Sequence, residues 1–210
     1  RTQEIIKKIN PDIIFHFAAQ SLVIESYKNP YKTYFENFVT TLNLLESLKN
    51  LNKLGATIFA TTDKVYKNLN KKVIFKENDE LGGNDPYSSS KVCCEELISI
   101  YTKFFLKNKI GSVTVRAGNV IGGGDWNKNW LIPDIIRSKK KNTKLIIRNP
   151  KHTRPWQHVF ECLFTYILIA EKIFKKNKYN GAYNISSFNT RSYKVEDIIN
   201  ISKKIISLPK

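Results

Sequence analysis

Short apolar runs alternate with amphipathic stretches along this sequence, and the alternation limits the folds open to the chain. The runs Asp12–Ala19, Ala56–Thr61 and Ser112–Arg116 are typical of strands buried on both faces. From Tyr34 to Leu48, apolar residues recur at three- and four-residue steps, which predicts a helix of about twenty residues. Strands that alternate with helices in this way predict right-handed crossovers and an α/β fold with a doubly wound parallel sheet.

The same patterns extend over the remaining sequence. The segment from about Gly122 onward mixes short elements, which predicts a smaller lobe laid over the sheet. Further helices are expected at 3–9, 87–105, 132–138, 162–174 and 195–206, and further strands at 145–148 and 182–185.

Polar residues follow the predicted strands at the points where the strands end. Gln20 follows the first strand, Thr62-Asp63-Lys64 the second, and Asn119 the third. Ligands of doubly wound sheets bind beyond the carboxyl ends of the strands, so these residues are candidates for a site. A loop of about twenty residues leads from Lys64 to Tyr87, and loops of that length in compact domains are usually functional.

Tyr87 and Lys91 are four residues apart, which places them one turn from each other on a single helix face. Asp85-Pro86 is a start signal for such a helix. A fixed ammonium and the positive end of a helix both favour the phenolate, so we expect the pair to lower the pKa of Tyr87. Tyr87 would then accept the proton of an alcohol that is being oxidised. The alternative interpretation is an ordinary surface pair, because the spacing alone is weak evidence.

Length and composition bound the class of protein. The chain has 210 residues and is 41% hydrophobic, enough for one packed domain and part of a second. It contains no Met and begins with Arg1, so we expect an internal part of a longer protein. No apolar stretch is long enough to span a bilayer and no signal peptide is visible, which favours the cytoplasm. Its three cysteines lack zinc-like spacing, which suits a reducing compartment and argues against disulfides and a metal site.

The formal net charge of +17 raises the hypothesis of nucleic-acid binding. The lysines are spread along the whole chain and accompany many Asn and Ile residues, which favours a solvated surface. A positive field would also attract an anionic small molecule. A nucleic-acid partner is therefore the weaker interpretation.

Tyr87 and Lys91, following a strand that ends in Thr62-Asp63, resemble the extended short-chain dehydrogenase/reductase family, with its NAD-dependent epimerases and dehydratases. Several blocks, in order over about residues 10 to 187, look like the signatures of the CDP-glucose 4,6-dehydratases within it. These blocks are Pro11–Gln20, Thr62–Tyr66, Leu81–Lys91, Arg116–Trp126, Leu131–Arg137 and Arg154–Val159.

The resemblance implies a reaction that oxidises a nucleotide sugar at C4, eliminates water across C5 and C6 and returns the hydride to C6. Tyr87 would accept the C4 hydroxyl proton, and Lys91 would lower its pKa and hold the nicotinamide ribose. Thr62 would bind the same hydroxyl where members usually carry Ser. Asp63 would protonate the leaving C6 hydroxyl. Lys64 matches the position at which dTDP-glucose dehydratases carry the Glu base, and it would act either as a neutral base or by stabilising the enolate.

The resemblance also implies a bound NAD. Ala18, Ala19 and Gln20 would let the cofactor approach the sheet, and Asn37 would face the nicotinamide. Members open with a strand and a Gly-rich turn that holds the pyrophosphate, and this sequence has no match to it, since Gly122–Gly124 falls elsewhere in the fold. We therefore expect the chain by itself to bind NAD weakly.

The nucleotide-sugar substrate, CDP-glucose by resemblance, would be held at its diphosphate by Asn119 and Arg154. His158 lacks the partners of a metal ligand. The expected domains are the end of the NAD-binding domain at 1–121 and an incomplete substrate-binding lobe at 122–210. Resemblance also implies a homodimer through the helices of Tyr34 and Tyr87.

Three alternatives stay open. The first is another nucleotide-sugar enzyme of the same family, a dTDP-glucose dehydratase or an epimerase, of which an epimerase would not need Asp63. The second is a non-catalytic remnant without the glycine turn. The third is a basic protein that binds nucleic acid.

Overall fold

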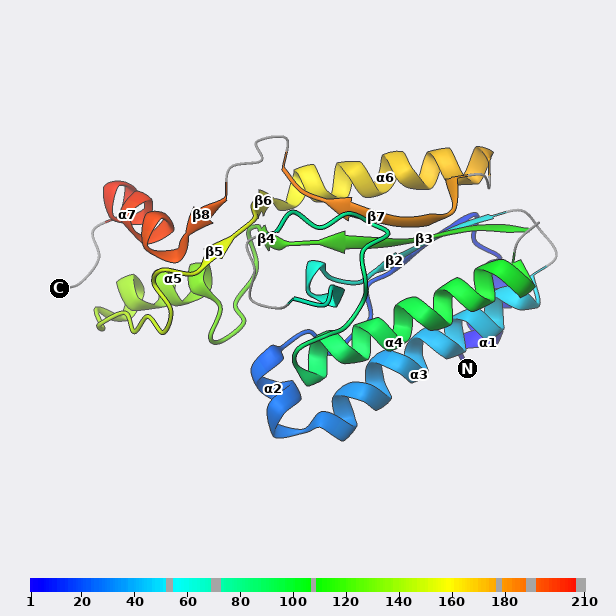
Figure 1. The fold of residues 1–210 in the computed structure, drawn as a ribbon, viewed down its shortest axis with the longest axis horizontal. Coiled ribbons are helices and arrows are strands. Elements are labelled where there is room, and N and C mark those ends of the chain that lie inside the picture. The colour runs from blue at the N-terminus through cyan, green and yellow to red at the C-terminus, as the bar shows by residue number, and fades with distance from the viewer. Residues whose placement is uncertain (52–54, 69–72, 107–108, 177–178, 188–191, 207–210) are drawn as a thin grey trace. The chain divides into compact units, whose positions relative to one another are not determined.

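The computed structural model describes residues 1–51, 55–68, 73–106, 109–176, 179–187 and 192–206 (Figure 1). The chain forms two compact units. The first consists of Arg1–Ala117 and Phe164–Ile185, and the second of Gly118–Leu163 and Ser186–Lys210. Within the described part of the chain, no helix has the length and apolar character needed to cross a membrane.

The first unit is built on a four-stranded parallel sheet in the order β1-β2-β3-β7. Its strands are β1 (Ile13–His16), β2 (Gly55–Ala60), β3 (Ile110–Ala117) and β7 (Gly181–Ile185). The two central strands, β2 and β3, are buried along nearly their whole length, as their apolar runs require. The prediction of an α/β fold with a parallel sheet is confirmed.

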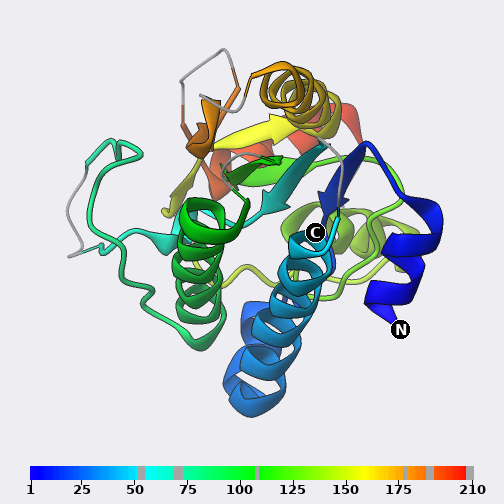
Figure 2. The same cartoon turned by 90° about the vertical axis from the view of Figure 1, so that its right-hand side faces the viewer.

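Helices cover both faces of this sheet (Figure 2). On one face lie α3 (Pro30–Lys49) and α4 (Pro86–Tyr101), which pack against each other. On the other face lies α6 (Val159–Lys175). Two shorter helices, α1 (Thr2–Ile9) and α2 (Val23–Lys28), contact α3. The sheet is thus sandwiched between two helical layers, the doubly wound arrangement.

The main apolar core lies between α3, α4 and the sheet. Leu44, Leu45 and Leu48 of α3 are buried in it, and each buried side chain contributes about 1.5–3 kcal/mol. The π-helical turn Thr102–Leu106 follows α4 and places Leu106 in the same core. The buried core members are Leu44, Leu45, Leu48, Leu51, Phe59, Cys94, Ile98, Leu106 and Ile110.

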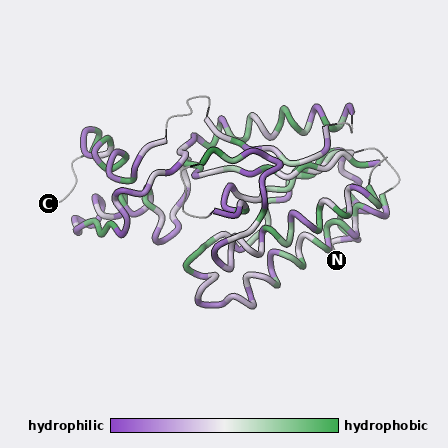
Figure 3. The backbone as a smooth tube through the Cα atoms, in the orientation of Figure 1, coloured by the Kyte–Doolittle hydropathy of each residue, from purple (hydrophilic) through white to green (hydrophobic). Residues whose placement is uncertain are grey.

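Helix α6 approaches the sheet closely at one point. A side chain on Gly111 of β3 would meet the backbone oxygen of Ile173 at 2.7 Å, so the absence of a side chain there permits the contact. Tyr166, Ala170 and Ile173 of α6 are buried. The helix is hydrophobic on other sides too, as the green stretches of Figure 3 indicate, and its exposed apolar residues include Phe164, Ile167, Leu168 and Phe174.

The second unit contains two helices, α5 (Leu131–Lys141) and α7 (Val195–Ile205), which contact each other. It also contains two small sheets. One pairs β4 (Asn119–Ile121) with β6 (Trp156–His158) in parallel, and the other pairs β5 (Thr153–Arg154) with β8 (Tyr193–Lys194) in antiparallel.

The predicted strand at Leu145–Arg148 is wrong. These residues adopt an irregular conformation in which Ile146 is exposed and Arg148 donates to the backbone oxygen of Asn129. β-Branched residues favour a strand only where a neighbouring strand can pair with them, which sequence alone does not reveal.

Candidate functional site

The start of α4 fixes the positions of Tyr87 and Lys91. Asp85 caps the helix by accepting from the Ser88 backbone N–H at 2.8 Å, and the Ser88 hydroxyl reciprocally accepts from the Asp85 N–H. Pro86 occupies the first turn, where its missing N–H costs nothing. Tyr87 and Lys91 therefore lie one turn apart, and they are only 8% and 7% exposed, so the pair is not an ordinary surface pair.

The segment that follows β2 brings three more predicted residues beside α4. These residues, Thr62–Lys64, are called the strip below. Thr62 caps a 3-10 turn, Asp63–Val65, and its hydroxyl lies 3.2 Å from Asp63 Oδ1 and hydrogen bonds with Tyr87. The Lys64 ammonium lies 5.9 Å from the centre of the Tyr87 ring. The structure thus brings Thr62, Asp63, Lys64 and Tyr87 together at the carboxyl end of the sheet.

The pKa of Tyr87 departs from the sequence-based expectation. The pKa of Tyr87 is raised to about 12, chiefly by burial; the hydrogen bond with Thr62 lowers it, and the carboxylates of Asp63 and Asp85 contribute to the rise. The prediction that the Tyr87–Lys91 pair lowers this pKa is therefore wrong. Burial depends on tertiary packing, which a spacing of four residues does not reveal.

Lys91 carries a buried ammonium with hydrogen-bonding capacity to spare. It donates to the Ala60 backbone oxygen at 3.1 Å, the one hydrogen bond that the described residues give it, whereas an ammonium has three N–H donors. Burial lowers the Lys91 pKa, and Glu95 and Cys94 oppose that shift. The unused donors fit a hydroxyl-bearing ligand such as a ribose.

Asn37 holds the turn that follows β1. Its side chain is buried, accepts from the Gln20 backbone N–H at 2.7 Å, and donates to the Gln20 backbone oxygen at 3.1 Å and to Ser90 Oγ at 2.8 Å. It therefore ties the turn containing Ala18 and Ala19 to α4. Contact of these four residues with a cofactor stays a prediction.

The two predicted diphosphate-binding residues lie in the second unit. Asn119 begins β4, and its backbone N–H donates to Pro155, the neighbour of Arg154, at 3.0 Å. Arg154 lies in β5 beside Tyr193, and its guanidinium donates to the Thr153 backbone oxygen at 2.9 Å. The fold of this unit brings Asn119 and Arg154 to adjacent backbone segments. Their role in binding a substrate stays a prediction.

The His158 side chain contacts the first turn of α6, the helix that directly follows it. Its Nδ1 accepts from the Phe160 backbone N–H at 3.2 Å, and the two rings form an edge contact at 5.0 Å. Over the described ranges, no group of three His, Cys, Asp or Glu residues is arranged to hold a metal ion.

Sequence reasoning missed one member of the site. Glu95 lies one turn beyond Lys91 on the same face of α4, so Tyr87, Lys91 and Glu95 form a row with a four-residue step. All three are buried. The repeat of that step was the signal that could have identified Glu95, because a charged residue on the inner face of a helix needs a partner.

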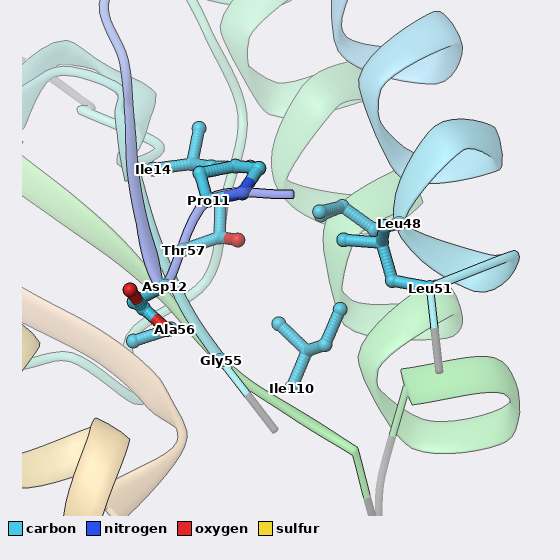
Figure 4. Close-up of a pocket in the computed structure, with 9 residues that line it drawn as sticks. All are labelled: Pro11, Asp12, Ile14, Leu48, Leu51, Gly55, Ala56, Thr57 and Ile110. Carbon is cyan, nitrogen blue, oxygen red and sulfur yellow. The ribbon is translucent and has the colours of Figure 1, made fainter. Parts of the chain in front are cut away.

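A small cavity lies at the opposite, amino end of the strands (Figure 4). Its volume of about 10 Å³ is enough for about one water molecule, and its walls are largely apolar. It is too small for a nucleotide sugar. The lining residues in Figure 4 include Pro11, Ile14, Leu48, Leu51 and Ile110.

Comparison with known proteins gives consistent results. The family model described as GDP-mannose 4,6 dehydratase matches residues 1–207. A CDP-glucose 4,6-dehydratase of Salmonella typhimurium is 42% identical over 201 residues, which are 92% of this chain and 56% of that protein. A dTDP-D-glucose 4,6-dehydratase of Dictyostelium discoideum is 29% identical over 217 residues, 98% of this chain and 47% of that protein. The chain thus spans about half the length of these curated relatives.

A solved structure shares the fold. The crystal structure of the UDP-glucuronic acid 4-epimerase from Bacillus cereus, in complex with UDP-glucuronic acid and NAD, superposes with a TM-score of 0.85 at 25% identity. The match covers 100% of this chain and 64% of that one.

Proposed function

This chain belongs to the GDP-mannose 4,6 dehydratase family, and on that premise we propose that it carries the catalytic centre of an NAD-dependent CDP-glucose 4,6-dehydratase. The observation that carries the proposal is the cluster of Thr62, Asp63, Lys64, Tyr87 and Lys91 at the carboxyl end of the sheet. The substrate is inferred from the 42% identical relative, whose name specifies CDP-glucose.

The first step is oxidation of the sugar at C4. Tyr87 accepts the proton of the C4 hydroxyl, and Thr62, its hydrogen-bond partner, orients the same oxygen. When bound, NAD would take up the C4 hydride, return it at C6 and add the positive charge of its nicotinamide ring. The Lys91 ammonium, which keeps N–H donors beyond its bond to the Ala60 carbonyl, would bind a ribose hydroxyl of the cofactor.

The second step is loss of water across C5 and C6. Asp63 in its protonated form donates its proton to the leaving C6 hydroxyl, and Lys64 as a neutral amine accepts the proton that leaves C5. A neutral Asp63 also removes one of the two negative charges that raise the pKa of Tyr87, so the acid role and the Tyr87 role are compatible. Lys64 lies 5.9 Å from the centre of the Tyr87 ring. The ammonium that forms when Lys64 takes up the C5 proton would stabilise the enolate at C5.

The experiment uses the full-length protein with CDP-glucose and NAD. The expected product is a 4-keto sugar nucleotide lighter than the substrate by one water, measured by mass spectrometry. Tyr87→Phe is the control for a reaction at this site and should form product at least about 100-fold more slowly. A product that retains the water would overturn the proposal in favour of an epimerase. Equal rates with CDP-glucose and dTDP-glucose would overturn the assignment of cytosine as the nucleobase of the preferred substrate.

We also propose that the protein is a homodimer through α3 and α4. An open apolar groove of about 370 Å³ lies on these helices, lined by Tyr31, Tyr34, Phe35, Phe38, Val39 and Cys93. Tyr31 is 78% exposed and stacks on the exposed Phe35 at 6.0 Å. Contiguous exposed aromatic surface of this kind marks a protein interface, and a second copy presents the same surface.

The substitution Phe35→Asp tests the dimer, because it puts a charge into the proposed interface. Sedimentation of the full-length protein should change from dimer to monomer, while Ile146→Asp, at a more exposed apolar residue of the second unit, should leave the dimer intact. A dimer that survives Phe35→Asp would contradict this interface.

A further inference from the structure

Glu95 and Arg116 form a buried ion pair beneath the candidate site. Both side chains are 4% exposed. The guanidinium donates through Nε to Glu95 Oε1 at 3.0 Å and through Nη2 to Oε2 at 2.9 Å, the bidentate geometry that makes a buried pair favourable. Breaking such a pair is costly because it leaves one charge buried without its partner.

The Glu95 carboxylate also connects α4 to β3 and to the end of β2. Besides Arg116, it accepts from the Thr61 hydroxyl at 2.6 Å and from the Thr114 hydroxyl at 2.8 Å. Thr61 directly precedes Thr62, and Glu95 lies one turn beyond Lys91. One carboxylate therefore links the helix of the Tyr87–Lys91 pair to the strand end that carries Thr62.

Arg116 reaches the other side of the same strip. Its Nη1 donates to the Tyr66 hydroxyl at 2.8 Å, and the guanidinium lies 5.0 Å from the centre of the Tyr66 ring. The Tyr66 hydroxyl in turn donates to Asn184 of β7 at 2.6 Å. Tyr66 follows Asp63 by three residues, so Arg116 holds the end of the strip Thr62–Lys64.

The long loop before α4 is attached to the same group. Arg116 Nη1 donates to the Glu77 backbone oxygen at 2.9 Å, and Phe75 stacks on Tyr66 at 4.7 Å. At the end of the loop, a side chain on Gly83 would lie 2.3 Å from the Ser89 backbone nitrogen, so the loop packs directly on the first turn of α4. The loop, the strip and the helix thus share Arg116 and Glu95 as anchors.

We infer that Glu95 and Arg116 are positioning residues, which hold Tyr87 and Lys91 of α4 in register with Thr62 and Asp63 at the end of β2. The inference rests on the proposed function, because the register is needed for proton transfer at C4. Neither residue touches the reacting atoms. Their effect is exerted through Thr61 and Tyr66, each of which adjoins the strip that they hold.

The test uses Tyr66→Phe in the full-length protein. This variant removes only the hydroxyl between Arg116 and Asn184 and keeps the ring that stacks on Phe75. The matched control is Tyr101→Phe, which removes a tyrosine hydroxyl bound to Glu46 at the far end of α4. Glu95→Gln is a second variant, which keeps the shape of the side chain but removes its charge.

Two readouts separate positioning from stability. In single turnovers with CDP-glucose and NAD, formation of reduced nicotinamide should slow about tenfold in Tyr66→Phe and more in Glu95→Gln, with KM for CDP-glucose within about twofold of wild type. Tyr101→Phe should leave the rate unchanged. An unchanged rate in both test variants, measured well below their unfolding temperatures, would overturn the inference.

Hydrogen exchange gives a readout that does not need activity. Backbone amides of residues 73–85 and of the first turn of α4 should exchange about tenfold faster in Tyr66→Phe than in Tyr101→Phe, because the loop loses an anchor. If the wild type forms no 4-keto sugar but this difference is found, the proposed function fails and the anchoring stands. Equal exchange in the two variants would contradict the anchoring itself.

Discussion

The two ends of the parallel sheet in the first unit are filled by opposite kinds of side chain. At the amino ends, Leu48, Leu51 and Ile110 pack around a cavity of about 10 Å³. At the carboxyl ends, Glu95 and Arg116 are buried with a set of hydroxyls around them. Apolar packing tolerates exchanges of similar volume, whereas buried charges require fixed partners. The amino end of the sheet therefore contributes mainly to folding stability, and the carboxyl end holds the residues of the candidate site in fixed positions.

Among substitutions at the carboxyl end of the sheet, Tyr87→Phe should have the largest effect on activity. It removes the proton acceptor, so kcat for C4 oxidation should fall by about 10²–10⁴-fold, or about 3–5 kcal/mol in activation free energy. The measurement is formation of reduced nicotinamide in the full-length protein. The unfolding temperature should change little, because the ring remains. If the variant retained wild-type activity, the carboxyl end of the sheet would not be the catalytic end.

The substitution Leu48→Ala tests the apolar end. Leu48 is fully buried beside the small cavity, so its truncation should cost about 2–5 kcal/mol in the free energy of unfolding, measured with denaturant. Activity per folded molecule should be unchanged at low temperature, because the cavity lies at the end of the strands away from Tyr87. The exposed Ile74→Ala serves as the control and should cost little. Equal losses of activity per folded molecule in Leu48→Ala and in Glu95→Gln would break the distinction between the two ends.

A smaller effect is expected from His16, which lies at the end of β1 and contacts Thr41 Oγ1 at 3.2 Å. Burial, and then the charge of Lys91, lower the pKa of His16 from 6.5 to about 4. Between these two values the unfolded chain binds more protons than the folded one, so stability is present above about pH 6.5 and falls as pH drops toward 4.

The His16 contribution has an upper limit of about 3 kcal/mol. Denaturant unfolding at pH 7 and at pH 4.5 should show a larger loss on acidification in the wild type than in His16→Gln, since the other titrating groups are shared. The same loss in both proteins would show that the polar end does not depend on a neutral His16.

Features determined by interactions between residues close in the sequence were predicted correctly, and features determined by distant residues were not. The start of α4 was predicted because Asp85 and Pro86 act within one helical turn. The buried strands were predicted from their unbroken apolar runs. The strand expected at 145–148 is wrong because strand formation needs a neighbour distant in the sequence.

The candidate site shows the same dependence on range. The position of Thr62 and Asp63 followed from the rule that parallel strands end at one edge of the sheet, and their association with Tyr87 followed from the family resemblance. The pKa of Tyr87 was predicted in the wrong direction because burial raises it and the nearby carboxylates of Asp63 and Asp85 add to that shift. Arg116 was predicted to end a strand and to begin a signature block, but its role was missed, since its bonds to Glu95 and Tyr66 join segments 21 and 50 residues away.

The contact between Gly111 and α6 has a consequence for sequence variation. The Cβ that any other residue would add at position 111 lies 2.7 Å from the Ile173 backbone oxygen and 2.9 Å from the Ile173 Cβ. A backbone atom cannot rotate away as a side chain can, so a larger residue at 111 requires a shift of the whole helix. Among relatives, positions 111 and 173 should therefore covary, with glycine retained wherever the helix keeps its present distance from β3.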